Sequence, residues 1–177
     1  MRLFVAIDLP PDLRQRLSGL AGGLPNARWV APENYHLTLR FLGEIPAYRA
    51  EEADTALSML RGRGFSLQFA GVGVTSKAGR PVSLWAGVER NPNLDHMRGK
   101  IETALQRIGF EPERRRFNPH VTLARLDNVP ELKLAEWVQA HNLFRAEPVQ
   151  VEHFTLFSSR LGKDQAVYTP EVDYELA

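Results

Sequence analysis

Apolar residues along the chain recur with two periods, which predict an alternation of strands and helices. Apolar runs of alternating or fully buried type, bounded by Gly, Pro or Asn, predict strands at residues 3–7, 28–30, 36–42, 65–69, 72–75, 82–88, 121–126, 149–157 and 166–174. Apolar positions spaced three and four apart predict helices at residues 13–20, 47–60, 94–108 and 130–142. The pattern therefore indicates a mixed chain of strands and helices.

The order strand, helix, strand, helix, strand occurs twice. Residues 3–6 align with residues 84–87, His36 with His120, and residues 67–68 with residues 149–150, at offsets between 81 and 84. The repeat predicts a single domain over residues 1–177 with internal copies at about 1–79 and 80–177. Two such copies related by a pseudo-two-fold axis would form two lobes that face each other across a central cleft.

A four-residue motif lies at equivalent positions of the two copies. It reads His-Leu-Thr-Leu at residues 36–39 and His-Val-Thr-Leu at residues 120–123. Alternate residues of a strand share a face, so each motif places His and Thr on one face. The intervening Leu and Val residues, and Phe41 with them, are expected in apolar packing. Each wall of the cleft would thus present an imidazole beside a hydroxyl.

Composition narrows the classes of function. The 177-residue chain has 22 Lys and Arg against 21 Asp and Glu, so it has no large field of one sign to hold long nucleic acid without specific contacts. It has no Cys, which excludes disulfides and thiol nucleophiles. The apolar run at residues 3–7 is too short for a signal peptide, and no later run approaches a membrane span. The expected location is the cytoplasm, with no membrane contact.

Two imidazoles that titrate near neutral pH can provide a general acid and a general base in one turnover. Phosphodiester cleavage requires that pair, because the attacking water loses a proton and the leaving alkoxide gains one. The hydroxyls of Thr38 and Thr122 can donate to non-bridging phosphate oxygens, where charge accumulates. Neither motif offers a third ligand for zinc, so no metal or other cofactor is expected.

The chain resembles the two-histidine (2H) phosphoesterases, and within them the RNA 2',3'-cyclic phosphodiesterases, also called 2'-5' RNA ligases. The resemblance covers nearly the whole chain. It includes residues 2–10, residues 32–44, residues 119–125 and the tail segments 154–159 and 168–170.

This resemblance implies an α+β fold with an antiparallel sheet in each lobe around a central cleft and helices outside. It implies hydrolysis of terminal 2',3'-cyclic phosphates on RNA ends or small nucleotides to 2'-phosphomonoesters. His36 would be the proton donor and His120 the proton acceptor, while Thr38 and Thr122 would bind the phosphate. Arg125 matches a basic position in similar proteins, although strict alternation places it on the face opposite His120.

Other interpretations remain open from the sequence. A non-catalytic nucleotide-binding or RNA-binding module on the same fold is the alternative function, and 2'-5' ligation would use the same residues in reverse. The expected protein is a monomer without an obligate protein partner. Trp29, Tyr35 and Phe41 are interpreted as core residues, His96 as solvated, His141 as lying at a helix C-terminus, and His153 as a core or cleft residue.

Overall fold

The computed structural model describes residues 1–177 as an α+β fold of ten strands, four α-helices and one short 3-10 helix. The strands are β1 (Arg2–Asp8), β2 (Ala27–Trp29), β3 (His36–Glu44), β4 (Phe65–Leu67), β5 (Phe69–Lys77), β6 (Arg80–Val88), β7 (His120–Leu126), β8 (Val149–Val151), β9 (His153–Leu161) and β10 (Ala166–Glu175). The helices are α1 (Pro11–Ser18), η1 (Pro32–Asn34), α2 (Ala47–Ser58), α3 (Pro92–Arg107) and α4 (Glu131–His141). None of the helices is both long enough and apolar enough to cross a bilayer.

Eight strands form one antiparallel sheet in the order β10-β9-β1-β3-β7-β6-β5, with β2 paired to β7. The two motif strands, β3 and β7, are neighbours at its centre. They share only one residue pair, Leu37 with Val121, so the strands diverge on either side of that pair. β4 and β8 form a separate two-stranded sheet.

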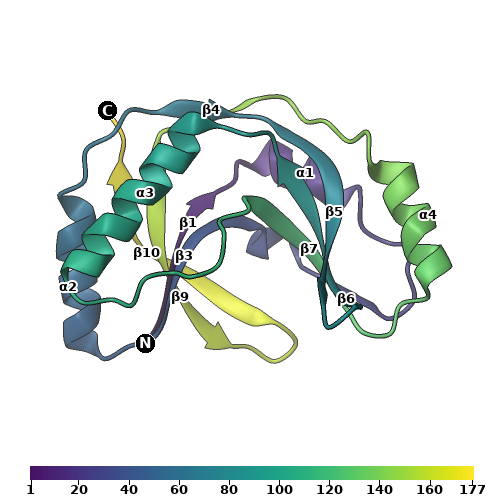
Figure 1. The fold of residues 1–177 in the computed structure, drawn as a ribbon, viewed down its shortest axis with the longest axis horizontal. Helices are drawn as coiled ribbons and strands as arrows, with labels where there is room; N and C mark the ends of the chain where they lie inside the picture. The colour runs from purple at the N-terminus through teal and green to yellow at the C-terminus, as the bar shows by residue number, and fades with distance from the viewer.

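All four α-helices contribute to one hydrophobic core. Buried residues of α1 to α4 join those of the central strands in a single cluster of 34 residues. Figure 1 shows α2 and α3 together at the left and α4 at the right, with the strands between them. A second cluster, Phe4, Ala6 and Phe157, contains no helical residue. That side of the sheet is therefore left open, and the histidines lie on it.

The predicted fold class is confirmed, and most predicted elements lie within a few residues of the observed ones. Two predicted strands were wrong in extent: residues 65–69 divide between β4 and β5, and residues 149–157 divide between β8 and β9. Both divisions occur where the chain leaves the small sheet for the large one. The division into two lobes stays an interpretation, which the single residue pair between β3 and β7 favours.

Each motif strand contains a β-bulge directly after its Thr. Along β1, Ala6 pairs with Thr38 and the preceding Val5 pairs with Arg40, so Leu39 is an extra residue. Along β6, Trp85 pairs with Thr122 and Leu84 with Ala124, so Leu123 is extra in β7. A bulge reverses the alternation that follows it, because two successive residues share a face. Leu39 and Arg40 are accordingly both buried, as are Leu123 and Ala124.

The bulge turns Arg40 into the core, where it forms a buried ion pair with α3. Arg40 Nε donates to Glu102 Oε2 at 2.7 Å, and the two side chains are only 8% and 11% exposed. Burial alone would raise the pKa of Glu102, but hydrogen bonds from Arg40, the Glu113 amide and Gln106 outweigh it and lower that pKa to about 2. The carboxylate thus joins β3 to α3 and to the chain that follows α3.

Changing Glu102 to Gln should destabilise the protein by about 3 kcal/mol at neutral pH, because Arg40 would remain buried without its counter-charge. The folded pKa lies below the usual 4.5, so this stabilisation is complete above about pH 4.5 and is lost as pH falls toward 2. The free energies of unfolding of the wild type and of Glu102→Gln, measured in urea, should therefore converge as pH falls from about 4.5 toward 2. Glu136→Gln, on the exposed side of α4, is the control. Equal stabilities of the Glu102 variant and the control at pH 7 would contradict the assignment.

Candidate active site

The four motif side chains surround the one residue pair that joins β3 to β7. Because Leu37 faces Val121 in antiparallel register, the neighbouring positions set His36 opposite Thr122 and Thr38 opposite His120. All four side chains are partly exposed, whereas Leu37 and Val121 are fully buried. The histidines are diagonal neighbours, a relation that in a regular ladder separates residues by roughly 7–8 Å, somewhat less at Cβ, and by more where strands diverge. The predicted His and Thr residues therefore come together on the open face.

Both imidazoles are held in the same tautomer. His36 Nδ1 lies 2.7 Å from the carbonyl oxygen of Asn34, and His120 Nδ1 lies 2.6 Å from that of Asn118. A carbonyl oxygen can only accept, so each Nδ1 carries a proton and donates it. Each Nε2 is thereby left free to accept a proton when the ring is neutral or to donate one when the ring is charged. This is the arrangement that acid-base catalysis requires.

Aromatic rings fix the orientation of each histidine. The His36 ring lies 4.8 Å from Phe4 and 5.1 Å from Tyr168, which meets it edge-on at 88°. Phe157 stacks on Phe4 at 5.2 Å. These contacts leave the imidazole little freedom to rotate, and they remove water from one side of it.

Trp85 takes the equivalent place beside His120, at 5.6 Å between ring centroids. Its indole Nε1 donates to Thr75 Oγ1 at 3.0 Å. Its ring also lies directly over Gly73, where an added Cβ atom would overlap the indole. Only glycine fits beneath this ring, so Gly73 of β5 allows Trp85 to lie beside His120.

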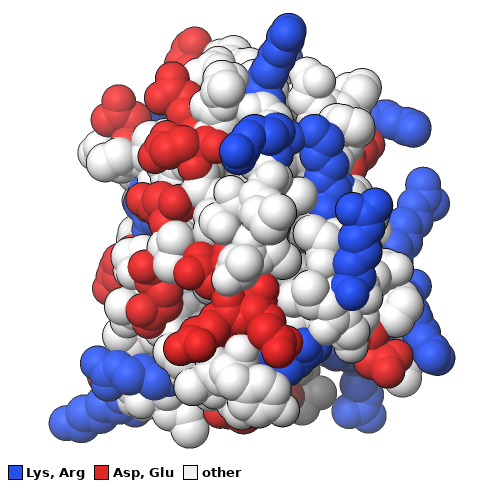
Figure 2. All heavy atoms as spheres, turned by 90° about the vertical axis from the view of Figure 1, so that its left-hand side faces the viewer, with Lys and Arg blue, Asp and Glu red and all other residues white.

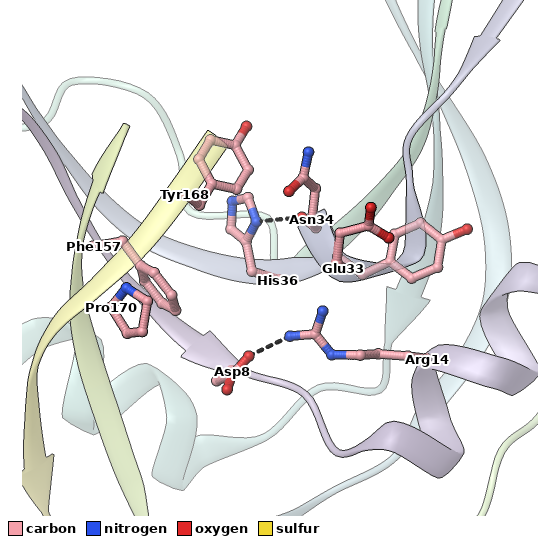
Figure 3. Close-up of a pocket in the computed structure, with 9 residues that line it drawn as sticks. Asp8, Arg14, Glu33, Asn34, His36, Phe157, Tyr168 and Pro170 are labelled. Carbon is pink, nitrogen blue, oxygen red and sulfur yellow. Dashed lines mark hydrogen bonds and ion pairs between the residues drawn. The ribbon is translucent and has the colours of Figure 1, made fainter. Parts of the chain in front are cut away.

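A pocket of about 200 Å³ opens beside His36 (Figure 3). Its wall includes the ion pair between Arg14 of α1 and Asp8 at the end of β1, together with Glu33 and Tyr168. Arg14 also donates to the carbonyl oxygens of Leu9 at 2.9 Å and of Pro32 at 2.8 Å, which ties α1 to η1. The pocket thus joins a rigid polar wall to the aromatic surroundings of the imidazole.

The pKa of His36 is lowered from its ordinary value, chiefly because burial disfavours the charged ring. The hydrogen bond to Asn34 and the charge of Asp8 act in the opposite direction, while Arg14 and Arg125 lower the pKa further. His36 is consequently neutral at pH 7 in the free protein. A bound phosphate anion would reverse the balance and favour the protonated ring.

Arg125 lies on the same face as His120, contrary to strict alternation. The bulge at Leu123 reverses the alternation, and Arg125 is exposed opposite Arg28 of β2. Its charge is close enough to lower the pKa of His36, although His36 is in the other motif strand. A guanidinium in this position can bind an oxyanion held between the histidines.

The prediction that Phe41 lies in the core is wrong, because the bulge at Leu39 turns its side chain to the other face. Its side chain is 52% exposed and lies 5.9 Å from Phe4, on the histidine face and not in the core. Phe41 follows His36 by five residues, as Arg125 follows His120. In each strand one bulge residue brings the side chain back to the histidine face. The first motif therefore has an aromatic ring, and the second a guanidinium, at the equivalent position.

Of the other candidates from the sequence, Tyr35 directly precedes His36 and lines the pocket beside it, whereas His96 and His141 lie on helices away from the motifs. Tyr35 is buried, and Trp29 packs against Trp137. His96 is exposed on α3, and His141 ends α4 with Nδ1 donating to the Trp137 carbonyl oxygen at 2.7 Å.

The expectation for His153 was wrong as regards the core. His153 is only half-buried. It is the first residue of β9 and pairs with Glu175, whereas Val151, which was expected on the same strand, belongs to the separate strand β8. No group of three or more His, Asp and Glu side chains is placed to hold a metal ion.

Sequence reasoning overlooked the aromatic neighbours and the carbonyl acceptors. The aligned segments already matched Phe4 with Trp85, and Asn34 and Asn118 each precede a motif histidine by two residues. These equivalences were available signals. Tyr168 and Arg14, by contrast, have no counterpart in the repeat and meet His36 only through tertiary structure.

The family described as LigT like Phosphoesterase has a model that matches residues 7–85 and 87–168, which include both motifs. The chain belongs to this LigT-like family. An RNA 2',3'-cyclic phosphodiesterase of Escherichia coli K12 is 33% identical over 183 residues, covering 96% of this chain and 93% of that relative. One of Thermotoga maritima is 32% identical over 176 residues, covering 95% and 91%. One of Geobacillus stearothermophilus is 34% identical over 128 residues, 69% of this chain but only 41% of that relative.

Solved LigT-like structures share this fold. E. coli LigT in complex with 3'-AMP superposes with a TM-score of 0.81 at 29% identity, covering 99% of this chain and 97% of that one. A Thermus thermophilus protein superposes with a TM-score of 0.83 at 23% identity, again over 99% and 97%. The α+β arrangement described above is therefore that of the LigT-like family.

The lowered pKa of His36 can be measured by NMR titration of the imidazole signals. In the free protein His36 should titrate below the ordinary value of 6.5, because burial opposes protonation. Addition of inorganic phosphate should raise that pKa, since an anion between the histidines stabilises the charged ring. His96, exposed on α3, is the internal control, and its ring signals should not respond to phosphate. Titration of His36 above 6.5 without phosphate would disprove the assigned environment.

Proposed function

We propose that this protein is an RNA 2',3'-cyclic phosphodiesterase that hydrolyses terminal 2',3'-cyclic phosphates to 2'-phosphomonoesters. The observation that carries the proposal is the pair of imidazoles, each with its Nδ1 bound to a carbonyl oxygen and its Nε2 free, on one open face. Relatives that match most of the chain bear the name of this activity. A protein that only bound nucleotides would not require two oriented titrating groups.

Two proton transfers accompany the proposed displacement at phosphorus. Water attacks the phosphorus atom while His120 Nε2 takes its proton, and the bond from phosphorus to O3' breaks while His36 Nε2 gives a proton to O3'. The products are a 2'-phosphomonoester and a free 3'-hydroxyl. Solvent exchange then restores the neutral His120, and His36 takes up a proton again when the next phosphate binds.

The hydroxyls of Thr38 and Thr122 would donate to the non-bridging oxygens, with Arg125 as a charged partner. In the antiparallel register that Leu37 and Val121 set, each Thr position faces the histidine position of the other strand, so one phosphate would be able to contact both motifs at once. The negative charge of the bound phosphate would also raise the pKa of His36 and so prepare it as the acid. Ligation of 2'-5' ends would follow the same path in reverse with the same residues.

Proton transfer by side chains predicts activity without a metal ion. Hydrolysis of a nucleoside 2',3'-cyclic phosphate should persist in excess EDTA, with a 2'-nucleotide as the product identified by chromatography. His36→Ala and His120→Ala should each lower kcat by on the order of 10² or more. The double variant should lose far less than the product of the two effects, because the residues act as a unit. Activity abolished by EDTA and restored by one divalent ion would refute this mechanism.

Aryl phosphodiesters distinguish the two histidines, because a nitrophenolate leaves without a proton whereas water still requires a base. His36→Ala should therefore lose far less activity on a nitrophenyl ester than on the cyclic nucleotide, and His120→Ala should remain impaired on both. The alkaline limb of the pH profile should disappear in His36→Ala and the acid limb in His120→Ala. Rescue of His120→Ala by the aryl ester would mean that the roles are exchanged.

A further inference from the structure

Three consecutive arginines occupy the segment that joins α3 to the second motif. Residues 108–119 run from the end of α3 to His120, shown in green in Figure 1, and Arg114, Arg115 and Arg116 are all exposed within it. Arg116 precedes His120 by four residues, so its Cα is at most about 14 Å from that of the histidine. The proposed catalytic chemistry uses none of these three side chains.

The first part of this segment is fixed to the core. The backbone amide of Glu113 donates to Glu102 Oε1 at 2.8 Å, and the Glu111 carbonyl oxygen accepts from Arg40. Arg40 and Glu102 are themselves buried and paired. The chain is therefore held by charged hydrogen bonds immediately before the arginines begin.

The last part is fixed as well. The guanidinium of Arg98, on α3, lies 5.2 Å from the centre of the Phe117 ring, and Asn118 accepts the hydrogen bond from His120. The arginines lie between these two attachments. Their backbone is thus held in place beside the second motif, which lowers the entropy cost of binding a ligand there.

The positive charge of the segment is largely uncompensated. Arg115 Nε lies 3.7 Å from Glu113, while Arg114 and Arg116 have no carboxylate within ion-pair distance. Across the face that contains α2 and α3, acidic side chains fill much of the left and centre of the view, and basic ones gather at the top and toward the right, with a further group at the lower left (Figure 2). A chain with a net charge of only +1 therefore still presents a local positive surface.

We propose that Arg114, Arg115 and Arg116 bind backbone phosphates of a single-stranded RNA whose terminal cyclic phosphate lies between His36 and His120. The inference rests on the proposed function and specifies its substrate as an RNA strand in preference to a free nucleotide. Guanidinium groups bind phosphate oxygens in pairs, and such contacts are indifferent to base sequence. Even at the helical rise of about 3.4 Å per nucleotide, three or four nucleotides reach from the histidine to the arginines.

The test compares two substrates with the triple variant Arg114→Gln/Arg115→Gln/Arg116→Gln. One substrate is a nucleoside 2',3'-cyclic phosphate, and the other is an oligoribonucleotide of about eight residues with the same end. On the nucleotide, kcat/KM should be unchanged. On the oligonucleotide at about 0.05 M salt it should fall on the order of tenfold or more. The slope of log(kcat/KM) against log salt should decrease by about 2, at roughly 0.7 per lost contact.

Arg61→Gln/Arg63→Gln/Arg90→Gln is the matched control. It removes the same charge from exposed positions on the loops that follow α2 and β6, beside the small β4–β8 sheet. This control should keep the activity of the wild type on both substrates. Thermal unfolding of both triple variants checks that each is folded.

Three outcomes would overturn the inference: an unchanged rate on the oligonucleotide, an equal loss on both substrates, or an equal loss in the control variant. Failure of the wild type to hydrolyse either substrate would instead refute the proposed function. In that case, fluorescence anisotropy with a labelled oligonucleotide bearing a terminal phosphate still decides whether the arginines bind RNA. The triple variant should then bind more weakly than the wild type and the control.

Discussion

A single extra residue after each His-x-Thr motif determines which side chains reach the open face of the sheet. Strand geometry alone places His and Thr together, and the bulges at Leu39 and Leu123 then reverse the alternation. Two successive residues of each strand enter the core as a result, which seals the sheet directly beneath the motif. The residue after them returns to solvent. Phe41 and Arg125 owe their positions beside the histidines to this step.

The same geometry explains an electrostatic contrast across the sheet. On the helical side, Glu102 stays charged in the core because Arg40 and a backbone amide satisfy it. On the open side, His36 lies among aromatic rings, with two arginines that lower its pKa further. The buried pair therefore stays charged at neutral pH, while burial disfavours the charged imidazole and a bound anion would favour it. Protonation of the acid is thereby linked to occupancy of the site.

Local pattern was sufficient to predict a mixed chain of strands and helices, the two motif strands and the shared face of His and Thr, while the resemblance to the 2H phosphoesterases implied the α+β fold class. The helix predicted at residues 94–108 begins two residues earlier, at Pro92, because Asn91 accepts from the amides of Asn93 and Leu94 as a local cap. The bulges were not predictable, because they depend on pairing with β1 and β6. The contact of Tyr168 with His36 and the Arg40–Glu102 pair likewise join residues far apart in the chain. No window of sequence contains both partners.

The strand order has a consequence for how the two copies depend on each other. From the centre outward it reads β3, β1, β9 on one side and β7, β6, β5 on the other. In the repeat that the sequence predicts, β9 belongs to the second copy and β5 to the first, so each copy would give one long strand to the other's half of the sheet. A lone copy would have an unpaired inner strand, and two lone copies would satisfy each other as a strand-swapped dimer. On the predicted repeat, the chain would be such a dimer made continuous, with the β5–β6 hairpin as its link.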